Sequence, residues 1–190
     1  MSSNKNWIVV VGLMVFGVFA RLIPHIPNFT PTESIAIFGA AYLGFRYLSY
    51  LLPLSLIFIS DFVINNTIAR PFFPEKSGII WFDSYMIYTA LAIVSIVFIS
   101  KLMLRKVNFK NVLATVISGT IIFYLFTNFA AWAMPASIYP SHPGGLMMAY
   151  IAGLPFLKIS LLGNLVFSGI MFGSMYLIEQ KLVNKQSTIA

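Results

Sequence analysis

Long apolar runs separated by short polar breaks dominate this sequence. They cover residues 7–24, 31–45, 47–64, 84–103, 112–134 and 155–178. A helix needs about 20 mostly apolar residues to cross the hydrocarbon core of a bilayer. With 59% hydrophobic and 9% charged residues among 190, the chain has no room for a sizeable soluble domain. We expect an all-α helical bundle: one integral membrane domain over residues 1–190 with about six transmembrane helices.

Two of these runs have ends that local sequence signals define. Thr30-Pro31-Thr32-Glu33 combines a capping residue, a proline and an acidic residue, which predicts a helix start near Pro31. The run from there to residue 45 gives a helix of about 22 Å, shorter than the hydrocarbon core of about 30 Å, so we expect a partial or packed-in span. Pro155 predicts the start of the last helix, with residues 147–153 at the membrane interface.

Basic residues indicate the orientation. One side collects Lys5, Arg46, Lys101, Arg105, Lys106, Lys110, Lys181 and Lys185, while the other has only Arg70 and Lys76. Cytoplasmic loops carry an excess of Lys and Arg. We therefore expect a multi-pass protein of the inner (cytoplasmic) membrane with both termini cytoplasmic. The net charge of +7 has no soluble face on which to gather, so we expect the lipid bilayer, and not nucleic acid, as a partner.

Three charged residues stand out within the expected helices: Arg21, Asp61 and Lys158. A charge in the bilayer costs about 2.5 to 3.5 kcal/mol on insertion scales and needs a partner or a purpose. Arg21 and Asp61 have matching expected depths near the outer side, which predicts an ion pair. That pair either fixes helix packing or lines a cavity open to the outside, and Lys158 either joins the cavity or extends to the interface.

Polar residues of the outer side add to these charges. Asn128 and Asn164 lie within expected helices, where an unsatisfied amide is costly. A water-filled cavity at the outer ends of the helices would satisfy such groups and the proline-rich backbone near them. The candidate substrate-binding residues are Arg21, His25, Asn28, Asp61, Asn128, Trp132 and Lys158. The alternative is that these residues only tie loops together.

Catalytic and metal-binding patterns are poor. The chain has no cysteine and two widely spaced histidines, and it lacks paired acidic motifs and a glycine-rich lysine loop. We expect no enzyme activity, no cofactor and no metal site.

Small residues recur every four positions at Ala36, Ala40 and Gly44, and again at Gly169 and Gly173. This spacing lets helix backbones approach closely. It serves packing within the bundle, or it forms a docking face for another membrane protein.

Three stretches carry a family resemblance: Pro27-Asn28-Phe29-Thr30-Pro31, Thr127-Asn128-Phe129-Ala130-Ala131-Trp132 and Gly153-Leu154-Pro155-Phe156. The chain resembles an uncharacterised family of small bacterial membrane proteins described as transport proteins, which are similar to the S components of energy-coupling-factor vitamin transporters. The resemblance implies a six-helix subunit that captures a small water-soluble nutrient, such as a vitamin, at the outer face. It also implies a partner, a membrane energising module with ATPases, and gives Ala36, Ala40 and Gly44 as the docking positions. The alternative is a non-transport scaffold subunit of a cell-envelope complex.

Overall fold

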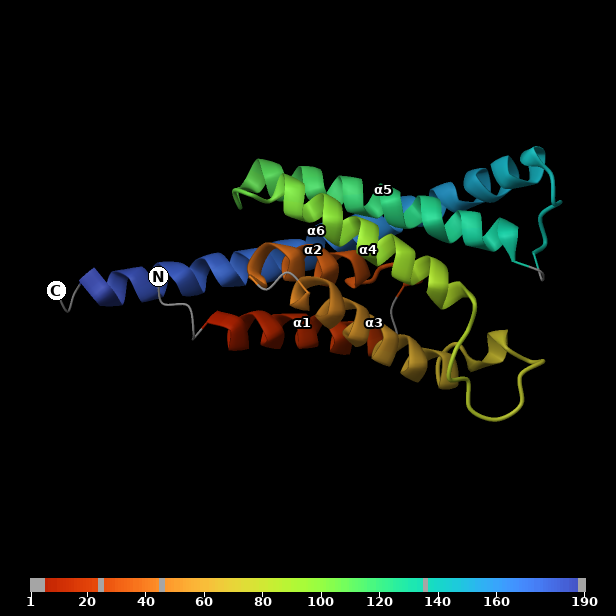
Figure 1. Cartoon of the computed structure of the whole chain (residues 1–190), viewed down its shortest axis with the longest axis horizontal. Coiled ribbons are helices and arrows are strands. Elements are labelled where there is room, and N and C mark those ends of the chain that lie inside the picture. Colours follow the sequence, from red (N-terminus) through yellow and green to blue (C-terminus); the bar gives the residue numbers. More distant parts are fainter. Residues whose placement is uncertain (1–5, 24–25, 45–46, 135–136, 188–190) are drawn as a thin grey trace.

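The computed structural model describes residues 6–23, 26–44, 47–134 and 137–187. The regular elements of these residues are all helices, and none of these residues forms a strand. The elements are α1 (Asn6–Leu22), α2 (Thr32–Tyr42), α3 (Leu48–Asn66), the 3-10 turn η1 (Arg70–Phe72), α4 (Tyr85–Met103), α5 (Phe109–Ala133) and α6 (Pro143–Ser187). Successive α-helices run in opposite directions along one long axis (Figure 1).

Four of these helices, α3 to α6, are long and apolar enough to cross a membrane, and α1 is a shorter apolar helix. The outer surface of the bundle agrees with this, because large apolar side chains such as Phe58, Phe98 and Leu162 are exposed along α3, α4 and α6. Soluble proteins rarely expose so much apolar surface. The four helices of spanning length and this apolar outer surface indicate a membrane protein, in which α1 and α2 are shorter helices.

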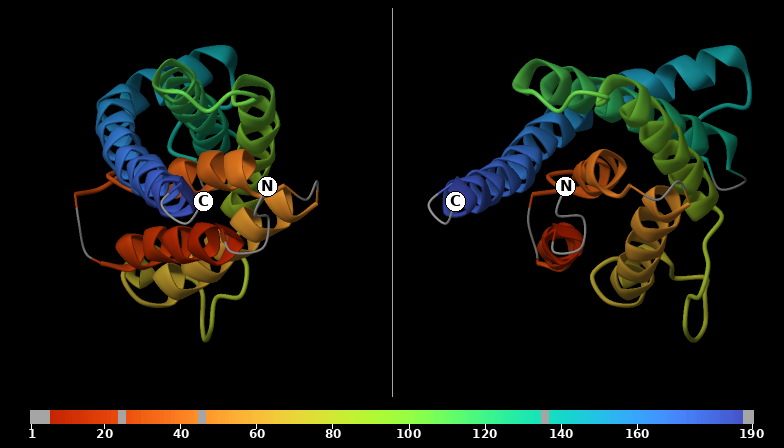
Figure 2. Two further views of the ribbon diagram at one scale, coloured as in Figure 1. Left: turned by 90° about the vertical axis from the view of Figure 1, so that its left-hand side faces the viewer. Right: turned by 60° about the vertical axis from the view of Figure 1, so that its left-hand side comes forward.

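The short helix α2 is the centre of the fold. It contacts α1, α3, α4, α5 and α6, and the end-on view in Figure 2 shows it enclosed by its neighbours. Every residue from Thr32 to Ala40 is buried, and Phe38 packs edge-on against Phe172 of α6 at 5.2 Å between ring centroids. At 11 residues it reaches about 16 Å, so it occupies only part of the bundle's length. The packed-in helix that its length predicted is present.

Helix α6 differs from the expected one. It begins at Pro143 and runs through Pro155 without ending, so residues 147–153 are helical rather than an interfacial segment. Both prolines suit a first helical position, and the sequence alone favoured the wrong one. An internal proline leaves the carbonyl four residues earlier without its helical donor, which membrane helices tolerate when neighbouring side chains supply donors. Close to this position, the Tyr124 hydroxyl of α5 donates to the Tyr150 carbonyl of α6.

The two ends of the bundle differ in charge. One end holds the start of α1, the end of α6 and the α4–α5 turn with Arg105 and Lys106 (Figure 1). The opposite end holds the α3–α4 connection, which is held in place by polar contacts. Asn66 and Ile80 exchange two hydrogen bonds of 2.8 Å, and Lys76 forms an ion pair with Asp83 at 2.6 Å.

Candidate functional site

Helix α2 begins part-way along the bundle, so the non-helical residues before it lie against the middle of α6. An added Cβ at Gly163 of α6 would sit 3.1 Å from the Phe29 Cα and the Thr30 nitrogen. A side chain at this position would push the loop backbone away by a few tenths of an ångström. Asn28 adopts a positive φ of 65°, a conformation that asparagine tolerates better than most residues. The first turn of α2 is therefore buried among the long helices, and Phe29 and Thr30 just before it lie against α6.

The expected ion pair between Arg21 and Asp61 is formed. The Arg21 Nη2 and the Asp61 Oδ1 lie 2.6 Å apart, and the two side chains are 9% and 16% exposed. Arg21 Nη1 also donates to the Ser60 hydroxyl and to the Ile57 carbonyl of α3. The pair thus joins the end of α1 to the C-terminal half of α3, near the start of α2.

Glu33 is a buried charged residue that the sequence reading missed. Its side chain is fully buried in the first turn of α2, where Oε1 accepts a 3.0 Å hydrogen bond from the Ser160 hydroxyl of α6. Oε2 is buried and has no hydrogen-bond partner among the described residues. In the sequence, Glu33 was explained as the acidic residue of the helix-start signal Thr30-Pro31-Thr32-Glu33. The sequence did contain a signal of a buried role for Glu33: this residue lies inside an apolar run, in a chain that has only five acidic residues.

A polar network continues from Glu33 towards α5 and α6. The Ser34 backbone N–H and hydroxyl both donate to Asn164 Oδ1, at 3.1 and 3.0 Å. Asn164 Nδ2 donates to the Ser160 carbonyl at 3.0 Å and to Thr120 at 3.3 Å, and the Ser168 hydroxyl lies 3.0 Å from that of Ser34. These contacts connect α2, α5 and α6 and satisfy the Asn164 amide, which the sequence places inside a helix and in need of partners.

A polar cavity of about 150 Å³ adjoins this network on the side away from the basic end of the bundle. Its wall combines amide, hydroxyl and phenol groups with apolar side chains. The lining residues are Asn28, Tyr85, Phe123, Tyr124, Thr127, Asn128, Ala131, Phe156, Leu157 and Ser160. Ser160 belongs both to this wall and to the hydrogen bond with Glu33, so the cavity ends against the buried carboxyl.

Asn128 owes its place in this wall to a glycine. An added Cβ at Gly153 of α6 would lie 2.2 Å from the Asn128 Oδ1, so the amide occupies the space that any other side chain would fill. The same amide donates a 2.9 Å hydrogen bond to the Tyr124 carbonyl of its own helix. Two candidate residues, Asn28 and Asn128, therefore line one cavity.

Comparison with known proteins gives one match, to a protein family. Residues 1–187 match DUF6580, a family of unknown function. The chain belongs to this family. No curated protein and no solved structure matches it. Membership agrees with the expected uncharacterised family, and the further likeness to S components stays a prediction.

The other described candidate residues of this DUF6580 protein lie outside the cavity wall. The Trp132 indole N–H donates to the Pro140 carbonyl at 2.9 Å and ties the end of α5 to the segment before α6. Lys158 is exposed and, because α6 begins at Pro143, lies roughly four turns into the helix rather than one. His25 lies outside the described residues. Arg21 and Asp61 form their pair next to α2 rather than in the cavity wall.

The small-residue positions behave differently on the two helices. Ala36 and Ala40 are 0% and 9% exposed within the core, so on α2 the spacing serves packing and leaves no continuous exposed face that includes Gly44. On α6 an added Cβ at Gly169 or Gly173 would meet nothing within 4 Å. These two glycines line an open groove of about 870 Å³ between α5 and α6.

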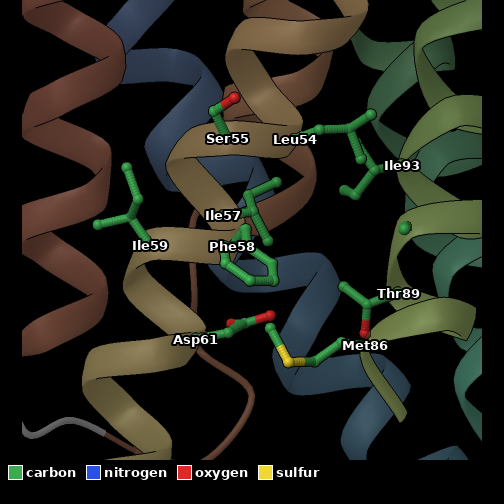
Figure 3. Close-up of a pocket in the computed structure, with 10 residues that line it drawn as sticks. Leu54, Ser55, Ile57, Phe58, Ile59, Asp61, Met86, Thr89 and Ile93 are labelled. Carbon is green, nitrogen blue, oxygen red and sulfur yellow. The ribbon is translucent and has the colours of Figure 1, made fainter. Parts of the chain in front are cut away.

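A third hollow lies between α3 and α4 and has a volume of about 500 Å³. Figure 3 shows its mostly apolar wall, with Leu54, Ile57 and Phe58 on α3 facing Ile93 on α4, and with Asp61 near Met86 at one end. Such a wall suits a hydrocarbon chain better than a polar solute. The 150 Å³ cavity is therefore the better candidate site for a water-soluble ligand.

Proposed function

We propose that this protein is a membrane transport protein that binds a small water-soluble nutrient in the polar cavity beside the start of α2. The observation that carries the proposal is the recessed start of α2: the non-helical residues Phe29 and Thr30 lie against the middle of α6, and the buried carboxyl of Glu33 adjoins a polar cavity. Irregular backbone at membrane depth is tolerated where protein or a water-filled cavity satisfies it. Broken or short helices with their ends at the substrate site are a recurring feature of transporters.

The polar interior favours transport over a purely structural role. Glu33, Ser34 and Asn164 are fully buried. Helix packing alone can be achieved with apolar and small residues, whereas ionisable residues inside a bilayer mark solute or ion pathways. A scaffold needs a specific outer surface and gains nothing from a polar cavity in its interior.

The proposed membrane arrangement follows from the helix lengths. Helices α3 to α6 cross the membrane, and α1 with α2 forms a hairpin that enters from the basic end and turns inside the bilayer. Lys101, Arg105, Lys106 and Lys181 mark that end as cytoplasmic by the excess of basic residues. Both termini are then cytoplasmic, the membrane is the inner one, and the cavity lies in the outer half.

The cavity size restricts the solute in this conformation. A water molecule occupies about 30 Å³ in the liquid, so 150 Å³ corresponds to about five water molecules. A vitamin of the kind that S components capture would require the cavity to widen on binding. The described residues that line the cavity include no lysine or arginine, so the proposed solute is neutral or cationic.

A thermal-shift screen tests this function. Purified protein would be heated with a panel of small neutral, cationic and anionic solutes, and a binder raises the unfolding temperature by mass action. We expect stabilisation by a neutral or cationic solute and its loss in Asn128→Ala, with Lys158→Leu as a matched variant outside the wall. Stabilisation that survives Asn128→Ala unchanged would remove the cavity from consideration.

The alternative role, a membrane subunit that binds another membrane protein, is favoured by the groove at Gly169 and Gly173. Exposed small residues permit close approach of a partner helix, whether from an energising module or from an envelope complex. Leucine at Gly169 would fill the groove. Loss of a co-purifying membrane protein in Gly169→Leu, without loss of solute binding, would identify this surface as the docking face.

A further inference from the structure

Three charged groups meet near the start of α2, and their charges do not cancel. Arg21 on α1 and Asp61 on α3 neutralise one another in a direct ion pair of 2.6 Å. Glu33 interacts electrostatically with Arg21 but forms no ion pair within the described residues. If Glu33 is ionised, this part of the bundle holds one uncompensated negative charge. An unpaired charge in a low-dielectric interior is costly, and binding a positive species removes that cost.

The surroundings of Glu33 leave one oxygen available for such a species. Oε1 is occupied by the hydrogen bond from Ser160, while the buried Oε2 has no partner among the described residues. The nearby groups of α6, Ser160 and Asn164, are a hydroxyl and an amide. No described group of three or more His, Asp and Glu residues could hold a metal ion. A proton needs a single oxygen and suits this site better than a metal cation.

Access to water comes through Ser160. Its hydroxyl donates to Glu33 and also belongs to the cavity wall. The other titratable groups near this route are Tyr85 of α4 and Tyr124 of α5, which line the same cavity. Ser160 is therefore the group that lies between cavity water and the Glu33 carboxyl.

We propose that Glu33 is the proton-binding group of this protein, with Oε2 as the atom that gains and loses the proton and Ser160 as the link to the cavity. Oε2 takes a proton from cavity water and returns it to water, so nothing else is consumed. Protonation at the first turn of α2 changes the charge beside the Ser34–Asn164 contacts that hold this helix to α6. The proposal rests on the proposed transport function, for which it names the coupled ion.

The experiment uses a hydrophobic carbodiimide, which modifies carboxyl groups that are protonated in apolar surroundings. The full-length protein in lipid nanodiscs would be treated with dicyclohexylcarbodiimide over a range of pH, and modified sites located by peptide mass spectrometry. We expect modification of Glu33 that increases as the pH falls, its absence in Glu33→Gln, and its persistence in the matched variant Glu179→Gln. The site is located in the parent protein, so the result stands even if Glu33→Gln fails to fold.

Two outcomes would overturn the proposal. One is the absence of Glu33 modification at every pH in protein that remains folded. The other is pH-independent modification that sodium, but not potassium, suppresses, which would assign a metal cation to the site. The thermal-shift screen is independent of this measurement. Modification of Glu33 without any solute binding therefore supports proton binding and rejects solute capture. Solute binding without modification of Glu33 supports solute capture and rejects proton binding.

Discussion

Asp61→Asn tests the interior electrostatics of the bundle. The change keeps the size of the side chain and one oxygen acceptor, but it removes the charge 2.6 Å from Arg21. The side chains are 9% and 16% exposed, so water screens little of the lost attraction. Removing one partner of a buried ion pair costs about 3 to 5 kcal/mol. Because Arg21 keeps its bonds to Ser60 and the Ile57 carbonyl, we expect the lower end of that range, about 3 kcal/mol.

The assay for Asp61→Asn is thermal unfolding of purified protein in detergent. For a chain of this length 1 kcal/mol corresponds to about 2 to 4 °C, so Tm should fall by about 6 to 12 °C. Lys76→Met is the matched control: it breaks the Lys76–Asp83 pair, which has the same 2.6 Å separation but a lysine that is 40% exposed. We expect that control to cost at most about 1 kcal/mol. Equal effects of the two changes would refute the reasoning about burial.

The remaining predictions concern backbone approach and topology. Gly163→Ala places a methyl group 3.1 Å from the backbone at Phe29 and Thr30, so the loop must shift; we expect about 1 to 3 kcal/mol of lost stability in the unfolding assay and weaker solute binding. Gly153→Ala places a methyl group where the Asn128 amide lies, so it should abolish solute-induced stabilisation. Gly169→Ala adds a methyl group that meets nothing within 4 Å, so it should preserve that stabilisation and change the unfolding free energy by no more than about 1 kcal/mol. A single cysteine at Lys106 should react with an impermeant thiol reagent only after cells are opened, because positive loops remain cytoplasmic; reaction in intact cells would reverse the orientation.

Helix boundaries were predictable where a local signal acts alone. The expected run of residues 84–103 agrees with α4 (Tyr85–Met103) to within one residue. Helix α5 starts three residues earlier than expected because Asn108 caps it, with its side chain accepting from the Asn111 N–H at 2.9 Å. The start of α6 was misplaced because Pro143 and Pro155 give the same local signal, and only contacts with α5 decide between them.

The candidate site was predictable in part, where the need of a charge for a partner was enough to identify a contact. Matching the expected depths of Arg21 and Asp61 was enough to predict their pair, since each charge needed a partner. Glu33 was missed because its local role in starting a helix explained it, and burial by five surrounding helices cannot be read from a run of four residues. The place of Asn128 depends on Gly153, a contact between helices that one sequence does not reveal.

Native mass spectrometry of gently solubilised protein tests the central claim, solute capture in the cavity beside α2, most directly. We predict a small-molecule adduct on the parent protein and on Gly169→Ala, released under mild activation. We predict no adduct on Gly153→Ala, in which Asn128 loses its place in the cavity wall. An adduct equally abundant on Gly153→Ala and the parent, or no adduct on any protein after exposure to the solute panel, would contradict the account.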